Sequence, residues 1–228
     1  MTELAVVPSL QPELTIQASA QNVLFDEIAN DLADKGYSVH FNSLLCELCQ
    51  PLAAHVQTMP DTLFKRAGIG REDEHRVNEF VRTDHIRWIS ADNGVQSAWL
   101  AWAEAFQQQL NQRLFLGLFS FESHFAHYAI GDFYKKHQDA FKGEANRIVS
   151  LVLYLNSEWL PDDGGELVLY TGEDQQHQVK VTPLLGTLVV FLSEQFPHEV
   201  LPALRDRYSI ACWFRINNAC IEGIPLTI

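Results

Sequence analysis

Two histidines and one aspartate are the residues of this chain whose types and spacing best suit metal chemistry. His137 and Asp139 stand two positions apart, in an aromatic stretch interrupted by Gly131. In an extended strand, side chains at positions i and i+2 point to the same face, so this imidazole and this carboxylate would share one small volume. His198 follows a long apolar run and is the best candidate for a third ligand. Two histidines and one carboxylate form the facial triad that holds Fe(II) and leaves coordination positions open.

An arginine downstream of His198 bears on which metal such a site would hold. Zinc also accepts histidine and carboxylate ligands, and ligand spacing alone does not separate it from iron. Arg207 stands at the head of a predicted strand, where its planar guanidinium can hold a carboxylate through two hydrogen bonds. A zinc hydrolase needs no carboxylate-binding group behind its metal, so Arg207 favours iron.

Four short motifs follow one another between Phe121 and Arg215. They read Tyr128-x-x-Gly131-x-x-Tyr134-x-x-His137-x-Asp139, Tyr154-Leu-Asn-Ser-Glu-Trp159, Gly164-Gly165-Glu-Leu, and Pro197-His198-Glu-Val-x-Pro202 running into Arg207-Tyr208. Together they resemble the Fe(II)- and 2-oxoglutarate-dependent prolyl hydroxylases, and most closely the branch of the hypoxia-inducible-factor prolyl hydroxylases and their bacterial relatives. The resemblance implies Fe(II) as cofactor on His137, Asp139 and His198, with 2-oxoglutarate and dioxygen as cosubstrates and ascorbate as reductant.

The same resemblance implies which residues bind the cosubstrate. Arg207 would hold the distal carboxylate of 2-oxoglutarate, and Tyr154 would donate its hydroxyl to the same group. Tyr154 lies in an apolar strand, where a buried hydroxyl needs a partner; a core tyrosine bonded to backbone is the alternative. Tyr128 resembles the tyrosine near the chelating end of the cosubstrate, although the turn between that residue and the metal histidine varies in length within the family.

A second group of residues is implied to bind the substrate. Trp213 and Tyr134 would wall an apolar pocket for a prolyl ring, and Arg147 would lie at its mouth near the substrate backbone. Arg82 and Asp84 belong to a segment that resembles the Arg-x-Asp-x-Ile-x-Trp-Ile sequence found after the substrate loop in this branch.

The loop before that segment is long, polar and interrupted by glycines. Residues 62–80 have no helical or strand period, and such loops within a compact domain are usually functional or disordered. We expect a mobile lid that orders on a protein substrate. The opposite charges of Arg82, Asp84 and Arg147 would lock it when closed.

Short strands separated by turn sequences dominate the chain from Ser120 onward. The turns are Asp162-Asp-Gly-Gly165, Thr171-Gly-Glu-Asp174 and Pro183-Leu-Leu-Gly186. This rhythm, without intervening helical patterns, predicts an antiparallel sandwich or barrel. The resemblance implies a mainly β fold with supporting α-helices: a double-stranded β-helix (jelly roll) with N-terminal helices packed on its major sheet.

Two segments ahead of the strands have the apolar period of amphipathic helices. Residues 21–35 end at the stop signal Gly36, and residues 95–115 carry a tryptophan-rich stripe that we interpret as the support of the sheet. We therefore expect an N-terminal arm and a single oxygenase domain. Their boundaries are 1–18 for the arm and 19–228 for the domain, with helical support and substrate loop at 19–119, the double-stranded β-helix core at 120–216 and a C-terminal tail at 217–228.

Composition limits which cell compartments and which classes of partner are expected. The net charge of −13 argues against nucleic acid or an anionic membrane as a partner, because either requires a basic surface. The chain has no apolar run long enough to cross a bilayer and no secretory signal at its start. Four cysteines are too few for a disulfide framework, and Cys46 and Cys49 share one helix face as core thiols. We expect a cytoplasmic monomer.

The resemblance implies hydroxylation of C4 of a prolyl residue that a protein substrate presents in a loop. For bacterial members of this branch it implies a loop of a translation elongation factor. Two other functions stay open from the sequence. One is a 2-oxoglutarate oxygenase acting on a small molecule, and the other is a non-catalytic, cupin-like module that binds a metal or ligand.

Overall fold

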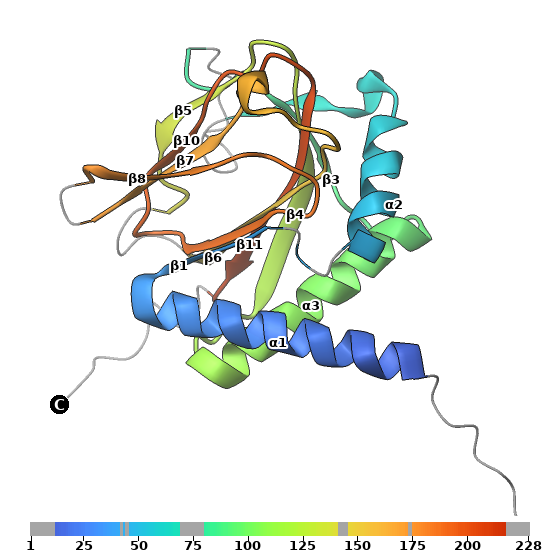
Figure 1. Cartoon of the computed structure of the whole chain (residues 1–228), viewed down its shortest axis with the longest axis vertical. Coiled ribbons are helices and arrows are strands. Elements are labelled where there is room, and N and C mark those ends of the chain that lie inside the picture. The colour runs from blue at the N-terminus through green and yellow to red at the C-terminus, as the bar shows by residue number, and fades with distance from the viewer. Residues whose placement is uncertain are drawn as a thin grey trace, which may run out of the picture.

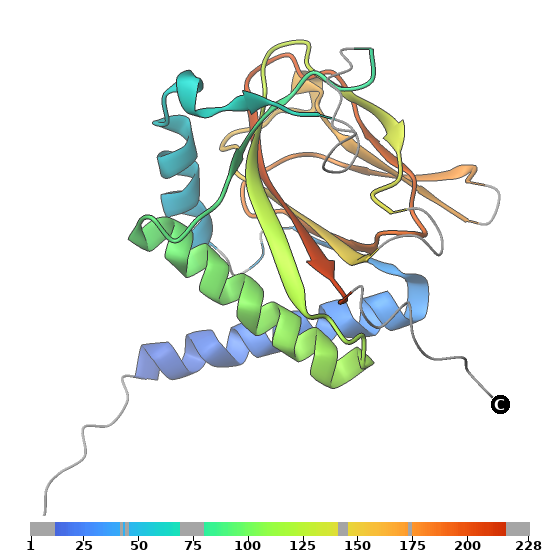
Figure 2. The same ribbon diagram turned by 180° about the vertical axis from the view of Figure 1, so that it is seen from behind.

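The protein is a double-stranded β-helix supported by helices, as expected (Figure 1). The computed structural model describes residues 12–41, 43, 46–68, 80–140, 146–172 and 175–217. In this part of the chain, two antiparallel sheets lie against each other and the helices cover one side of the larger sheet (Figure 2).

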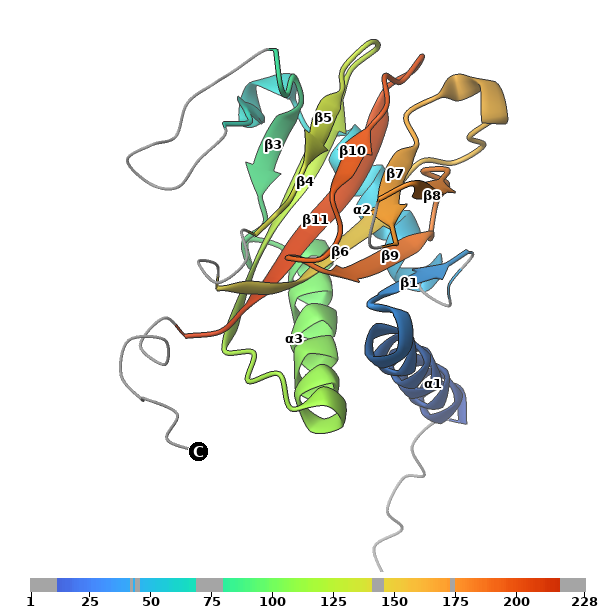
Figure 3. The same cartoon turned by 90° about the vertical axis from the view of Figure 1, so that its left-hand side faces the viewer.

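The larger sheet has seven strands in the described residues, in the order β1-β9-β6-β11-β4-β3-β2. Its strands are β1 (Tyr37–His40), β2 (Lys65–Arg66), β3 (His85–Trp88), β4 (Ser120–Tyr128), β6 (Arg147–Tyr154), β9 (Leu188–Leu192) and β11 (Arg207–Arg215). The long strand β11 lies at its centre between β4 and β6, and pairs with β4 from Arg207↔Tyr128 to Arg215↔Ser120 (Figure 3). This register places Arg207 and Tyr128, which were both expected to bind the cosubstrate, directly opposite each other.

The smaller sheet has the order β5-β10-β7-β8 in the described residues. Its strands are β5 (Tyr134–His137), β7 (Leu167–Thr171), β8 (His177–Val181) and β10 (His198–Val200). The turn before β7 contains Gly164 and Gly165, both at positive φ (67° and 69°). A Cβ at Gly164 would lie 2.6 Å from the carbonyl oxygen of Pro202, so this turn needs glycine for close approach as well as for conformation.

Three helices flank the larger sheet in the described residues: α1 (Pro12–Lys35), α2 (Cys46–Gln57) and α3 (Gly94–Leu114). Short 3-10 turns lie at Asp61–Leu63 and Pro161–Asp163. The helix α1 begins at Pro12, so residues 12–18 are helical and the expected arm at 1–18 is wrong for them. The apolar period that predicted this helix is clear only from residue 21, which is why its start was missed; residues 1–11 lie outside the described part.

The expected helical support is confirmed in α3. Its N-terminus is capped by the Asn93 side chain, which accepts a hydrogen bond from the Gln96 backbone N–H at 3.0 Å. Its aromatic stripe is buried, and Trp102 stacks between Trp99 and Phe106 with ring centroids 5.3 and 5.4 Å away. This stripe packs with α1 on the outer face of the larger sheet.

A second apolar cluster fills the space between the two sheets. It comprises Ala126, Tyr128, Tyr154, Leu167, Leu169, Val181, Val189, Phe191, Phe196 and Val200. In α2, Cys49 is fully buried, as a core thiol should be; the side chain of Cys46 lies outside the described residues. None of the described helices combines the length and apolarity that crossing a bilayer requires.

Candidate active site

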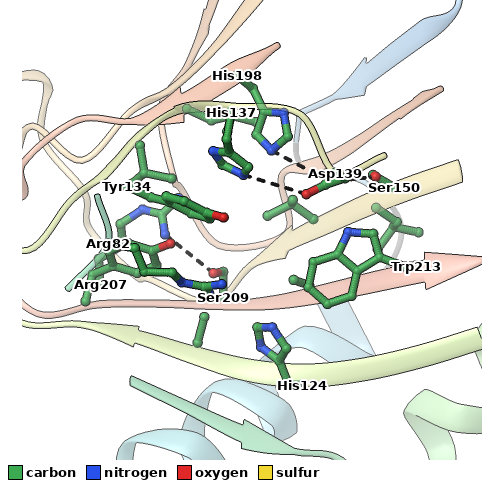
Figure 4. Close-up of a pocket in the computed structure, with 17 residues that line it drawn as sticks. Arg82, His124, Tyr134, His137, Asp139, Ser150, His198, Arg207, Ser209 and Trp213 are labelled. Atoms are coloured by element: carbon green, nitrogen blue, oxygen red, sulfur yellow. Dashed lines mark hydrogen bonds and ion pairs between the residues drawn. The ribbon is translucent and has the colours of Figure 1, made fainter. Parts of the chain in front are cut away.

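Three side chains meet in a pocket between the two sheets, and they are the ligands expected from the sequence. His137 ends β5, Asp139 follows it, and His198 opens β10 directly opposite His137 in the strand pairing. One potential ligand atom from each residue lies within 4.8 Å of the others. Asp139 Oδ1 is 3.6 Å from His137 Nε2, and Asp139 Oδ2 is 3.7 Å from His198 Nε2 (Figure 4).

The backbone fixes which nitrogen each imidazole turns toward the pocket. His137 Nδ1 lies 2.8 Å from the Lys135 carbonyl oxygen, and His198 Nδ1 lies 3.1 Å from that of Phe196. A carbonyl oxygen only accepts, so each Nδ1 carries a proton and each Nε2 is the nitrogen turned toward Asp139. Such hydrogen bonds behind a metal-binding histidine fix its tautomer and orientation.

His198 and Asp139 are held in the protonation states that a metal requires. Burial, followed by repulsion from His137, lowers the pKa of His198 to about 4, so its imidazole is neutral at pH 7. Burial alone would raise the pKa of Asp139, but His198, His137 and the Ser150 hydroxyl together hold it well below its ordinary value. A neutral His198 imidazole and an ionised Asp139 carboxylate fit Fe(II), because a metal binds deprotonated ligands.

Arg207 lies deep in the same pocket, with only 1% of its surface exposed. Its Nε donates to the Gly165 carbonyl oxygen at 2.8 Å, and its guanidinium carbon lies 4.8 Å from the ring centre of Tyr128 and 5.0 Å from that of Tyr154. No carboxylate among the described residues pairs with it. A buried guanidinium without an acidic partner fits a ligand carboxylate.

Tyr154 supplies a second open donor at this end of the site. Its hydroxyl is buried and has no hydrogen-bond partner in the described part of the chain, which excludes the alternative of a core tyrosine bonded to backbone there. Burial raises the pKa of Tyr154 to about 12, against the influence of Arg207, so the hydroxyl keeps its proton and can donate it. An orphaned buried donor beside Arg207 is what the distal carboxylate of 2-oxoglutarate would satisfy.

Two of the expected substrate residues wall the pocket near the triad. Tyr134 stacks on His137 with ring centroids 3.5 Å apart, and Trp213 lies on the other side of Asp139 (Figure 4). Arg147 stacks on the Trp213 ring at 4.1 Å and donates to Glu122 Oε1 at 2.6 Å. Arg147 therefore positions Trp213 and is itself not part of the pocket lining.

The expected lock between Arg82, Asp84 and Arg147 is only partly formed. Arg82 lines the pocket and pairs with Asp84, whereas Arg147 pairs with Glu122. Asp84 is fully buried behind Arg82 and does not line the pocket. Most of the expected lid, residues 69–79, lies outside the described residues.

Three polar residues of the pocket were missed in the sequence: His124, Ser150 and Ser209. A signal for His124 exists, because β4 alternates and Tyr128 was already assigned to the site. Positions 124, 126 and 128 share a face of that strand, and all line the pocket, while Phe125 packs toward the helices. Burial, with Arg82 adding to it, lowers the pKa of His124 to about 4.

The fold and this pocket together define a non-haem iron oxygenase that uses 2-oxoglutarate, and comparison with known proteins agrees. The sequence profile of the 2OG-Fe(II) oxygenase superfamily matches residues 123–215. A prolyl-4-hydroxylase structure from Pseudomonas putida shares 38% identity with a TM-score of 0.77, covering 85% of this chain and 100% of that chain.

Two animal proteins add to this comparison. A prolyl hydroxylase from Trichoplax adhaerens, solved with a peptide fragment of the hypoxia-inducible factor oxygen degradation domain, has a TM-score of 0.74 at 27% identity, covering 88% of this chain and 93% of its own. The hypoxia-inducible factor prolyl hydroxylase of Caenorhabditis elegans is 28% identical over 153 residues, 63% of this chain and 21% of that protein. The chain thus spans about a fifth of the length of this curated relative.

The chain belongs to the 2OG-Fe(II) oxygenase superfamily, and within it to the prolyl hydroxylase type. Members of this superfamily use Fe(II) and 2-oxoglutarate, and the His137, Asp139, His198 set fits that iron.

Proposed function

We propose that this protein hydroxylates C4 of a prolyl residue in a protein substrate, using Fe(II), 2-oxoglutarate and dioxygen. One observation carries the proposal. A His-Asp-His set, a buried Arg207 with no acidic partner in the described part of the chain, and an aromatic wall formed by Tyr134 and Trp213 line a single pocket. A metal-binding protein without turnover has no need for the carboxylate-binding end of this pocket.

Different residues of the pocket would bind the iron and the cosubstrate. His137, Asp139 and His198 would hold the iron, and Arg207 with Tyr154 would hold the distal carboxylate of the cosubstrate. When bound, Fe(II) and 2-oxoglutarate would allow dioxygen to be used as the oxidant, with one oxygen atom going to the C–H carbon as hydroxyl and the other into succinate as carbon dioxide is released.

The rest of the pocket orients the target and excludes water. Tyr134 and Trp213 present flat, rigid faces suited to a saturated five-membered ring. Burial of the pocket removes water from the reacting carbon, and binding in a fixed orientation replaces a bimolecular encounter. Burial raises the pKa of Tyr134 to about 12, so its hydroxyl stays neutral beside the target ring.

A prolyl residue in a loop of a folded cytoplasmic protein is the substrate class we propose, with a translation elongation factor as the first candidate. Two observations support a polypeptide over a free amino acid. A similar structure was solved with a peptide fragment bound, and the net charge of −13 would favour association with a basic protein surface.

Mass spectrometry tests this proposal directly. The purified protein, loaded with Fe(II), 2-oxoglutarate and ascorbate, is incubated with a purified bacterial elongation factor and, separately, with a cell lysate. We expect one oxygen atom added to a defined proline, succinate in equal amount, and neither product with the His198→Ala variant. Succinate formed with free proline or other small molecules, and no modified protein, would overturn the choice of substrate class.

A further inference from the structure

Behind Asp139 lies a pair of buried serines that the reaction described above does not use. Ser150 Oγ lies 2.7 Å from Asp139 Oδ2, and Ser193 Oγ lies 2.9 Å from Ser150 Oγ. Ser150 belongs to β6, and Ser193 is the first residue of the turn after β9. Both are withdrawn from solvent, with exposures of 1% and 0%.

The directions of these hydrogen bonds follow from donor counting. The ionised carboxylate of Asp139 can only accept, so the single hydroxyl hydrogen of Ser150 must point to Oδ2. That hydrogen is then unavailable to Ser193, so Ser193 donates its own hydrogen to Ser150 Oγ. The two hydrogen bonds therefore point in one direction, from Ser193 through Ser150 to Asp139. Each link strengthens the next in a buried, low-dielectric setting.

The hydrogen bond from Ser150 restrains one particular oxygen of Asp139. A donor on Oδ2 limits rotation of the carboxylate and withdraws electron density from that oxygen. The two oxygens are otherwise placed alike, with Oδ1 3.6 Å from His137 Nε2 and Oδ2 3.7 Å from His198 Nε2, so the serine contact is what distinguishes them. We infer that Ser150, backed by Ser193, is a positioning residue that makes Asp139 bind the iron through one oxygen only. This inference rests on the proposed use of Fe(II) and 2-oxoglutarate, but not on the prolyl substrate.

The number of ligand positions shows why one oxygen matters. A facial triad leaves three positions on a six-coordinate iron. A cosubstrate bound through its 1-carboxylate and 2-keto oxygen would take two of them, which would leave one for dioxygen. If both oxygens of Asp139 bound the metal, that last position would be filled. Ser150 would therefore keep open the coordination position at which dioxygen binds.

Nitric oxide provides the test, because it occupies the dioxygen position without turning over. Fe(II) and 2-oxoglutarate are added to saturation without oxygen, and nitric oxide binding is followed by electron paramagnetic resonance. Ser150→Ala should bind nitric oxide about tenfold more weakly, the lower end of the range for changes behind metal ligands. Ser193→Ala should shift in the same direction by less, and Ser150→Thr, which keeps the hydroxyl, should restore binding.

The chain contains a matched control for loss of a buried serine–aspartate hydrogen bond. Ser38 is fully buried and donates to Asp31 Oδ2 at 2.7 Å, but it lies on β1. Ser38→Ala should leave nitric oxide binding at the wild-type value. If Ser150→Ala and Ser193→Ala both bind nitric oxide as tightly as wild type at saturating iron, the inference is overturned. Should Ser150→Ala not fold, Ser193→Ala against Ser38→Ala decides the question.

These outcomes are independent of what the enzyme hydroxylates. Iron, 2-oxoglutarate and nitric oxide are the only ligands used, so a wrong proline target would leave the comparison intact. If the wild-type protein bound nitric oxide with iron but showed no response to 2-oxoglutarate, the proposed function would fail instead. The two failures are therefore distinguishable.

Discussion

Arg82 holds Asp84 through two hydrogen bonds, from Nε to Oδ1 at 2.6 Å and from Nη2 to Oδ2 at 2.8 Å. The Arg82 guanidinium also lies 4.5 Å from the ring centre of Tyr134, and Tyr134 stacks on the ligand His137. The fully buried Asp84 does not line the pocket itself and holds the guanidinium of Arg82, which does. Its role is to fix the guanidinium against the aromatic wall.

Removing the Asp84 carboxylate should affect the substrate side of the site more than the metal side. Asp84→Ala leaves Arg82 buried without its partner, a change that typically costs about 3–5 kcal/mol of stability. We expect prolyl hydroxylation to fall by a larger factor than decarboxylation of 2-oxoglutarate measured without prolyl substrate. Hydroxylation is followed by mass spectrometry of the prolyl substrate and decarboxylation by succinate release without it, with melting temperature measured alongside.

Asp26→Ala is the control, because it breaks a carboxylate–arginine pair away from the pocket, that of Arg113 between α1 and α3. Should Asp84→Ala lower both reactions by the same factor, the Arg82–Asp84 pair would belong to the support of the barrel and not to the substrate site.

Each residue of the triad should be indispensable for iron. His137→Ala, Asp139→Ala and His198→Ala each remove a ligand, and we expect turnover to be lost while the fold remains. Binding of Mn(II) or Co(II), measured by equilibrium dialysis, should weaken by at least about tenfold, the scale seen even for changes behind the ligands. Two variants with near wild-type activity would show that the triad is misassigned.

Arg207→Lys should weaken cosubstrate binding although the charge is retained. An ammonium is a point charge that cannot form the two parallel hydrogen bonds of a guanidinium. The loss should be about 1.5–3 kcal/mol, the contribution of a hydrogen bond to a charged group. Titration of the iron-loaded protein with 2-oxoglutarate measures it. Arg205→Lys, at an exposed position, is the control, and an unchanged dissociation constant for Arg207→Lys would place the carboxylate site elsewhere.

The sequence predicted the residues that bear the chemistry better than those that hold them in place. The two-residue repeat of a strand brought His137 and Asp139 together, although β5 ends at His137 and Asp139 lies in the bend that follows. Arg207 follows from its place at the head of a strand. Ser150 and Ser193 could not be predicted in this way. They are far apart in the sequence, and the pairing of β6 with β9 brings them together; it places Ser150 opposite Phe191.

The sequence likewise could not predict which charged side chains form pairs. Arg147 was expected at the substrate, but the register that pairs Arg215 with Ser120 in β4 and with Arg147 in β6 gathers both arginines around Glu122. Which carboxylate an arginine contacts depends on strand register and on the rotamers of long side chains. Neither can be derived from residue types alone.

His124 should make the stability of the metal-free protein depend on pH. Its ordinary pKa is 6.5, and burial, followed by repulsion from Arg82, lowers it to about 4 in the folded chain. Between these values the unfolded chain binds a proton that the folded chain does not, so the free energy of unfolding falls as pH drops from 6.5 to about 4.

His124→Gln should flatten this dependence, because one titrating group is lost. The slope should decrease by up to about 1.4 kcal/mol per pH unit, the free energy of one proton. Urea denaturation at intervals between pH 4.5 and 7, about the range over which the proton is taken up, gives the slope. Burial lowers the pKa of His198 to about 4, and His198 still titrates in this variant. The pH dependence of the free energy of unfolding should therefore become weaker without disappearing. His177→Gln, on the exposed part of β8, controls for the loss of a histidine as such. A slope for His124→Gln equal to that of wild type would mean that His124 takes up its proton in the folded pocket.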